Sequence, residues 1–172
     1  MIRSGAASGL LALLALPVLL WAKGDTVAIE ITGGSLRAPI RATNPVIDQF
    51  NVWSGAGANA GTLETATGFI IDWHSGIVAE PPAGLRQYQV SFYAGCRAGS
   101  NEPGCADERP HLAYVVSYDW DPSSGQGFVY LPGSSDPRWQ RNVTSIYRGV
   151  EGHWFRAAQA WDRFVRPLIA PR

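Results

Sequence analysis

The sequence predicts an α+β fold that is mainly β, in which an antiparallel sheet of about five to seven strands carries an amphipathic C-terminal helix packed on one face. Three observations support this prediction. Short segments rich in β-branched and aromatic residues alternate in polarity, as strands do. The connections between them contain Gly, Pro, Asn, Asp and Ser, which favour turns. Apolar residues recur at helical spacing in the segment from Trp154 to Arg166 near the end of the chain.

An apolar leader precedes the predicted sheet. Arg3 is followed by the apolar run Leu10–Ala22, which ends in the small residues Ala22 and Gly24. This pattern is typical of a secretory signal peptide, and the run is shorter than the roughly 20 apolar residues of a transmembrane helix. We expect a signal peptide over residues 1–24 and one globular domain over residues 25–172, secreted or periplasmic and without a transmembrane span. The alternative is an uncleaved segment that anchors the chain in the inner membrane.

The first part of the predicted domain contains one strand and two less regular segments. Thr26–Thr32 alternates in polarity and is rich in β-branched residues, so we expect a strand that ends at Gly33-Gly34. Asn44-Pro45 is typical of a helix start, which predicts a helical turn over Val46–Phe50. Ser54–Gly68 is small, polar and rich in Gly, and it predicts a loop.

The middle of the chain contains the strongest strand patterns. Phe69–Trp73 and Ile77–Ala79 are expected to pair as a hairpin through Ser75-Gly76. Arg86–Ala94 and Leu112–Trp120 alternate over their whole length, and we expect them to pair antiparallel.

A second hairpin should follow directly. Phe128–Leu131 is a strand pattern, and the turn-rich segment Asp121–Gly127 connects it to the preceding strand. Asp136 is expected to cap a short helical turn, and Thr144–Arg148 is a further strand candidate.

The C-terminal helix is predicted from the spacing of its apolar residues. Trp154 and Trp161 fall on one side of a helix over Trp154–Arg166, and the other side carries Arg156, Arg163 and Arg166. Both tryptophans are therefore expected in the core. Pro167 should end the helix near Val165 or Arg166.

Two cysteines, Cys96 and Cys105, flank a loop-like stretch. In an exported protein this pattern predicts one disulfide. The bridge closes a loop of about ten residues and should contribute about 2–3 kcal/mol to stability.

Composition excludes some classes of function. The formal net charge is zero and 46% of residues are hydrophobic, which excludes a disordered chain and a strongly basic nucleic-acid-binding protein. Charge is nevertheless uneven. Residues 45–136 contain ten acidic residues and three Arg, and residues 137–172 contain seven Arg and two acidic residues. One interpretation is a basic surface for an anionic partner. We favour the alternative, in which the two segments pack together and their opposite charges compensate.

The sequence contains no motif that assigns a catalytic or metal-binding residue. His74, His111 and His153 do not have the spacing of a metalloprotease helix, and no G-x-S-x-G nucleophile motif is present. The segment from Asp119 resembles the start of a calcium loop. It departs from that pattern because Ser124 replaces the turn Gly and Tyr130 replaces the bidentate Glu. We therefore assign no catalytic residue, no metal and no cofactor, although a spatially assembled site remains an alternative.

Aromatic side chains are the residues of this chain best suited to bind a ligand or partner. Trp53, Trp120 and Trp139 lie beside predicted loops and are the candidate binding residues. Exposed Trp side chains stack on sugar rings or anchor protein partners. We expect an exported, non-enzymatic domain with a binding or scaffolding role toward an envelope glycan or protein. The alternatives are a small exported hydrolase and a glycan-binding module that uses these tryptophans.

Five segments together resemble a group of exported bacterial proteins of unknown function. They are ITGGSLRAPI, GFIIDW, YQVSFYA, FVYLPG and RGVEGHWFRA. The resemblance covers most of the predicted domain. It implies an envelope or extracellular location, and it implies no activity, cofactor or catalytic residue.

Overall fold

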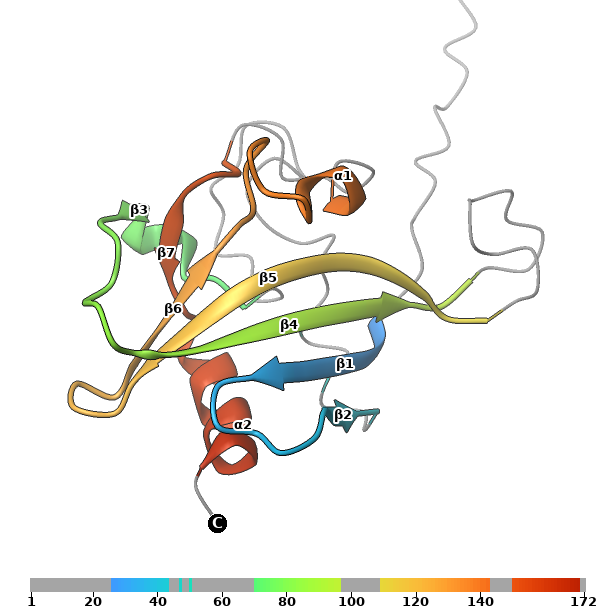
Figure 1. Cartoon of the computed structure of the whole chain (residues 1–172), viewed down its shortest axis with the longest axis horizontal. Helices are drawn as coiled ribbons and strands as arrows, with labels where there is room; N and C mark the ends of the chain where they lie inside the picture. Colours follow the sequence, from blue (N-terminus) through green and yellow to red (C-terminus); the bar gives the residue numbers. More distant parts are fainter. Residues whose placement is uncertain are drawn as a thin grey trace, which may run out of the picture.

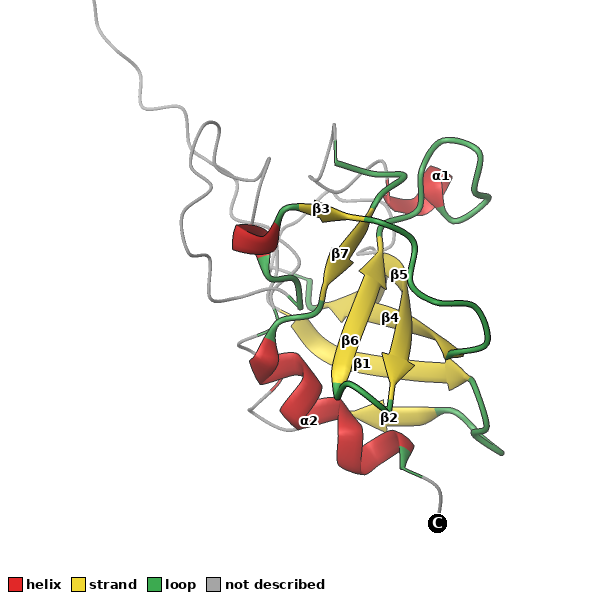
Figure 2. Cartoon of the chain, turned by 90° about the vertical axis from the view of Figure 1, so that its left-hand side faces the viewer, coloured by secondary structure: helices red, strands yellow, loops and turns green. Residues whose placement is uncertain are grey.

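The computed structural model describes residues 26–43, 47, 50, 70–96, 109–142 and 150–170. The strands are β1 (Thr26–Gly33), β2 (Ile40–Ala42), β3 (Ile77–Val78), β4 (Arg86–Ala94), β5 (His111–Asp121), β6 (Gln126–Tyr130) and β7 (Trp154–Arg156). They form one seven-stranded antiparallel sheet in the order β2-β1-β4-β5-β6-β7-β3. Figures 1 and 2 show helix α2 (Gln159–Ile169) lying against this sheet, and the predicted fold class is confirmed.

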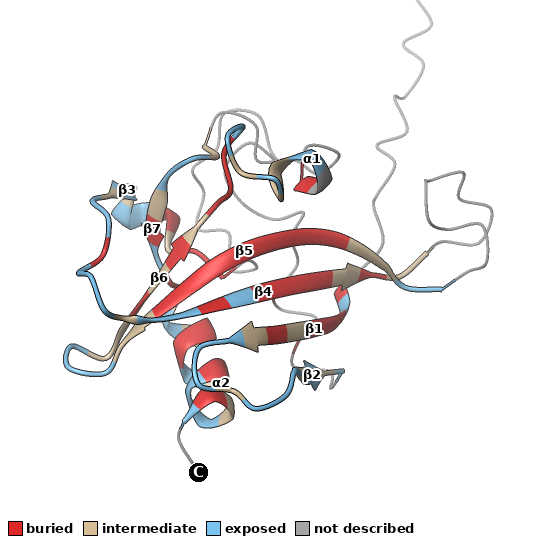
Figure 3. Ribbon diagram, in the orientation of Figure 1, coloured by how far each residue is buried: buried red, intermediate tan, exposed pale blue. Residues whose placement is uncertain are grey.

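The predicted pairing of β4 with β5 is confirmed and forms the centre of the sheet. Tyr88 lies opposite Tyr118, and Val90 lies opposite Val116. These side chains point to the face that carries α2, because alternate residues of a strand share a face. Figure 3 shows that β4 and β5 are largely buried along their length. The alternating apolar pattern therefore forms the core.

The predicted hairpin between β5 and β6 is also confirmed. Its turn is closed by the Asp121 carboxylate, which accepts hydrogen bonds from the Ser123 hydroxyl at 2.6 Å and from the Ser124 hydroxyl at 2.7 Å. These bonds, mainly those from Ser123 and Ser124 side chains, lower the pKa of Asp121 to about 2. The carboxylate that resembled a calcium ligand therefore stabilises the turn.

The predicted hairpin between Phe69–Trp73 and Ile77–Ala79 is wrong. Trp73–Ser75 forms a single 3-10 turn, which the Asp72 side chain caps by accepting a hydrogen bond from the His74 backbone at 3.1 Å. β3 pairs with β7 instead, and Ile71 bridges Ala157. Both segments satisfy their backbone hydrogen bonds on a distant strand, which local alternation cannot reveal.

The prediction of a helix over Trp154–Arg166 is wrong at its start. Residues 154–156 form β7, which pairs with β6 on one side and β3 on the other. The backbone stays extended beyond β7, because Ala157 N–H donates to Gly127 O and Ala158 N–H donates to Ile70 O, both at 2.8 Å. The helix can therefore begin only at Gln159. Trp154 lies on the sheet, half-buried, with its ring centroid 5.1 Å from that of Tyr130.

The predicted end of the helix near Val165 or Arg166 is also wrong. α2 continues through Pro167 to Ile169, and Ala170 N–H donates to Arg166 O at 3.0 Å. Proline lacks one backbone donor and disfavours this continuation. The added turn buries Ile169, which is 3% exposed, and this burial favours the longer helix.

The two helices contact the sheet at different places. On one face, Trp161 of α2 is fully buried and packs on the rings of Phe50 and Tyr118, with centroids 5.2 and 5.9 Å away. Beyond the part of β5 that pairs with β6 (Ser117–Asp121), the edge of β5 contacts α1 (Trp139–Asn142), which Figure 1 shows beside this edge and away from α2. The Asn142 side chain accepts from Val115 N–H at 2.8 Å and donates to Val115 O at 2.6 Å.

Several sequence predictions lie wholly or mainly outside the described residues. They are the signal peptide over residues 1–24, the helical turn Val46–Phe50, the loop Ser54–Gly68, the strand Thr144–Arg148, Trp53 and Cys105. Within the described part of the chain, no helix has the length and apolar character needed to cross a membrane. Cys96 is described, with its Sγ 3.1 Å from the Arg109 carbonyl oxygen. The Cys96–Cys105 disulfide stays a prediction.

Candidate functional site

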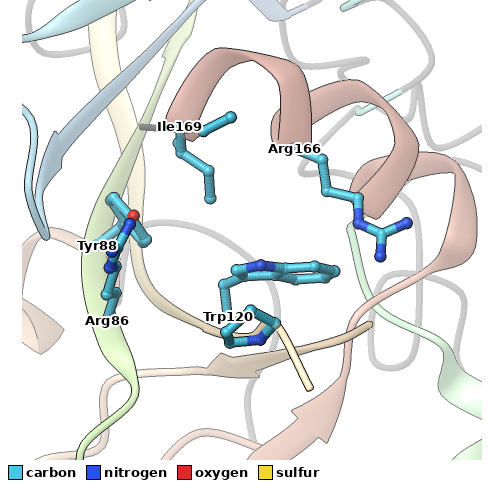
Figure 4. A pocket seen from close by; sticks show the side chains of 7 residues that line it. Arg86, Tyr88, Trp120, Arg166 and Ile169 are labelled. Atoms are coloured by element: carbon cyan, nitrogen blue, oxygen red, sulfur yellow. The ribbon is translucent and has the colours of Figure 1, made fainter. Parts of the chain in front are cut away.

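A pocket of about 310 Å³ opens where the start of β4, the end of β5 and the end of α2 meet. The described residues that line it are Arg86, Tyr88, Trp120, Pro122, Arg166, Ile169 and Ala170. Figure 4 shows Ile169 and Trp120 on opposite sides of this space, with Arg86 and Tyr88 on a third side and Arg166 on the fourth. Three elements, of which α2 is distant in sequence from β4 and β5, therefore supply the walls.

The register of the central hairpin positions one side of the pocket. Arg86 lies directly opposite Trp120 across the β4–β5 pair, so the two side chains are neighbours on one face. Tyr88 follows two residues later on the same strand and shares that face. The sheet therefore places a cation, an indole and a phenol side by side.

Helix α2 supplies the other side. The guanidinium carbon of Arg166 lies 4.3 Å from the centroid of the Trp120 ring, which is a cation–π contact. Ile169, one turn further along, contributes a buried apolar side chain. Ile169 reaches the pocket because the helix continues past its predicted end, whereas Arg166 lies at that end.

Tyr88 is the one deeply buried polar side chain among the described lining residues, at 1% exposed. Its hydroxyl has no hydrogen-bond partner among the described residues. The ring packs closely on Gly34, where any side chain would collide with it. A buried hydroxyl without a partner costs about 1–3 kcal/mol. The Tyr88 hydroxyl is therefore an unused donor and acceptor in the pocket wall.

The pocket is positively charged. Its described lining includes two arginines and no acidic residue. Arg86 forms a long hydrogen bond of 3.4 Å from Nη1 to the Ser35 hydroxyl, and neither Arg86 nor Arg166 forms an ion pair within the described part of the chain. Both side chains are exposed. The site therefore offers two guanidinium groups that no described carboxylate neutralises by direct contact.

A buried carboxyl on the opposite face is a second feature. Asp119 is 8% exposed, and its Oδ1 has no hydrogen-bond partner among the described residues. Burial raises the pKa of Asp119 to about 6; a hydrogen bond from Gln87 lowers it and the charge of Glu80 raises it. Alternation along β5 places Asp119 and Trp120 on opposite faces. Asp119 therefore does not belong to the pocket.

The three tryptophans predicted as binding residues are not brought together. Trp120 lines the pocket and is half-buried. Trp139 is half-buried on α1, beside the edge of β5 and away from α2 (Figure 1), and Trp53 lies outside the described residues. Among the residues that the structure describes, no three His, Cys, Asp or Glu side chains gather as they would around a metal ion.

The sequence analysis missed Arg86, Tyr88, Arg166 and Ile169 as site residues. Part of the signal was present, because the predicted β4–β5 pairing would have placed Arg86 and Tyr88 near Trp120. The sequence did not indicate the part that α2 plays, since helical spacing placed Arg166 on the side opposite Trp161 and Pro167 predicted that the helix would stop before Ile169.

Comparisons of the chain with protein-family models, with curated proteins and with solved structures found no significant match. The resemblance to exported bacterial proteins therefore stays an interpretation of the sequence.

Proposed function

We propose that the chain is an exported, non-enzymatic binding domain and that the pocket beside Trp120 is its ligand site. The observation that carries this proposal is the convergence of Trp120, two arginines and an unpartnered buried hydroxyl on one concavity. Small-molecule sites characteristically combine apolar walls with a few polar groups, in volumes of about 300–1,000 Å³. A pocket of about 310 Å³ is at the small end of this range.

A binding screen with a pocket-filling variant tests the proposal. The purified protein is titrated with neutral, anionic and cationic ring compounds, and binding is followed by the NMR signals of the indole N–H groups. Ala170→Phe places a ring at the pocket without removing a core side chain, because Ala170 is exposed and lies beyond the end of α2. The matched control is Ala83→Phe, at an exposed position that does not line the pocket.

Binding that Ala170→Phe abolishes and Ala83→Phe preserves supports the proposal. If no compound in any of the three charge classes shifts the Trp120 indole signal, the pocket is not a small-molecule site. Binding that is unchanged in Ala170→Phe places the ligand elsewhere and overturns the proposed site.

Export is the second part of the proposal, and it rests on the apolar leader. We expect the N-terminus of protein recovered from the periplasm or medium to begin near Asp25. Recovery of the full-length chain from the membrane fraction would instead support the uncleaved anchor.

A small exported hydrolase is the second candidate function. The burial of the Asp119 carboxyl is the observation that favours it. A carboxyl with its pKa raised to about 6 is suited to general acid–base chemistry near neutral pH. Turnover of ester, peptide or glycoside substrates that Asp119→Asn abolishes would support an enzyme. Turnover that persists in Asp119→Asn would exclude this residue from the chemistry.

A further inference from the structure

The walls of the pocket beside Trp120 have a flat, apolar part. Trp120 and Ile169 lie across the pocket from each other (Figure 4), and Pro122 adds a further apolar ring. An indole face favours offset stacking with another ring. A volume of about 310 Å³ admits a single ring with a short substituent. The body of the ligand is therefore a small planar or ring-shaped group.

The charge of the pocket selects the substituent. Arg86 and Arg166 approach from opposite sides, and the described lining contains no carboxylate to offset them. The Arg166 guanidinium is held over the Trp120 ring at 4.3 Å. Arginine offers paired N–H donors that match carboxylate and phosphate oxygens. A ring that lies in the pocket thus places its substituent within the field of two cations.

The Tyr88 hydroxyl adds a directional contact. It is closed to solvent in the wall and has no partner among the described residues, so the Tyr88 ring must shift toward the pocket before a ligand oxygen can take up its hydrogen bond. A phenol O–H donates strongly to an oxyanion. The three polar groups therefore favour the same kind of acceptor, and none of them favours a cation.

We infer that the pocket takes a small ligand with a ring-shaped apolar body and one oxyanion, either a carboxylate or a phosphate monoester. This inference rests on the proposed function and deepens it by naming the ligand class. The ring lies between Trp120 and Ile169, and the oxyanion accepts hydrogen bonds from Arg86 or Arg166 and from Tyr88. Carboxylate and phosphate share this chemistry, and separate probes distinguish them.

The test is a calorimetric titration of the purified protein with four probes of similar size. Phenylacetate and phenyl phosphate are anionic, phenylacetamide is neutral, and 2-phenylethylamine is cationic. We expect at least one anion to bind about tenfold or more tightly than the amide, since one charge-assisted contact has this magnitude. The preference should weaken as salt is added. Whichever anion binds more tightly identifies the carboxylate or the phosphate as the preferred group.

Three variants and a control test which residues cause the preference for anionic probes. Arg86→Gln and Arg166→Gln should each remove most of the preference for anions over phenylacetamide. Tyr88→Phe should weaken anion binding several-fold. Arg163→Gln is the control, because Arg163 is exposed on the same helix and does not line the pocket. Thermal melting of each variant establishes that it is folded. An equal loss of anion preference in Arg163→Gln would overturn the assignment of the cations.

The outcomes separate the ligand class from the proposed function. If phenylacetamide or 2-phenylethylamine binds as tightly as the anions, and Ala170→Phe blocks that binding, the pocket is a ligand site and the oxyanion inference is wrong. If none of the four probes binds and the wider ring-compound screen is also negative, both proposals fail.

Discussion

The Tyr118 hydroxyl on β5 donates a hydrogen bond of 2.8 Å to the carboxylate of Asp162 on α2, and both residues are buried. The other Asp162 oxygen accepts from the Gly127 backbone N–H at 3.1 Å. Burial raises the pKa of Asp162, whereas these two hydrogen bonds and the nearby Arg166 lower it. The contact fixes the first turn of α2 on the hairpin, and Arg166 follows one turn later over Trp120. It therefore helps to position the pocket.

Gly127→Ala should destabilise the fold. A methyl group at this position would collide with the Asp162 carboxylate and the Tyr118 ring. Overpacking of this kind costs about 1–3 kcal/mol in the free energy of unfolding. The measurement is urea unfolding of parent and variant. The same substitution in an Asp162→Ala background should cost less, because one colliding group is gone, and equal costs in both backgrounds would contradict this packing.

Trp161→Ala should lower the free energy of unfolding by about 3–5 kcal/mol, the usual cost of a large cavity. Trp161 is fully buried against Phe50, Phe92 and Tyr118. Circular dichroism during heating provides the measurement. Arg163→Ala, on an exposed position of the same helix, is the control and should melt close to the parent. A Trp161→Ala melting curve that matches the parent would exclude this residue as the anchor of α2.

Asn142→Ala should destabilise the protein by about 1–3 kcal/mol, since it leaves buried backbone groups without partners. The Asn142 amide pairs with both the N–H and the C=O of Val115. Gln140→Ala, at an exposed position of the same short helix, should have little effect. Denaturant unfolding and exchange of the Val115 amide hydrogen measure the change. Unaltered protection of that amide in Asn142→Ala would contradict the role of the side chain.

Asp119 should make stability fall with rising pH. Burial raises its pKa to about 6, above the value of about 3.9 expected in an unfolded chain. Between about pH 4 and about pH 6 the folded state therefore holds more protons than the unfolded state, and the free energy of unfolding decreases as the pH rises. Asp119→Asn should reduce this decrease.

Urea unfolding at a series of pH values measures the effect of Asp119. Glu80→Gln is the matched control, because Glu80 contributes only a secondary part of the shift and most of the decrease should persist. Identical pH profiles for the parent and Asp119→Asn would show that Asp119 does not titrate in this range.

Cys96 and Cys105 should be oxidised in the exported protein. The segment between them is rich in turn residues, and the apolar leader predicts an oxidising compartment. Thiol titration of the denatured protein should detect no free thiol before reduction and two after it. Cys105→Ser should expose the remaining Cys96 thiol. Two free thiols in protein recovered from the envelope would refute the bridge and weaken the case for export.

The sequence by itself determined the elements whose signal is local. Alternation in Arg86–Ala94 and Leu112–Trp120 predicted the central antiparallel pair, because side chains in a strand alternate between faces. Turn residues at Asp121–Gly127 predicted the second hairpin. Trp161 was correctly expected in the core, since a large apolar side chain in the helical segment gains most by burial.

The tertiary structure alone decided the boundaries of α2 and therefore the pocket. Residues 154–158 have a pattern compatible with a helix, yet residues 154–156 pair with β6 and β3, and the N–H groups of Ala157 and Ala158 donate to Gly127 and Ile70. Helical spacing cannot distinguish these alternatives, because the competing hydrogen bonds come from elsewhere in the chain. At the other end, burial of Ile169 outweighs the cost of Pro167. Only the docking of this helix brings Arg166 to Trp120. From the sequence alone, Trp120 and Trp139 were equally good candidates for a binding residue.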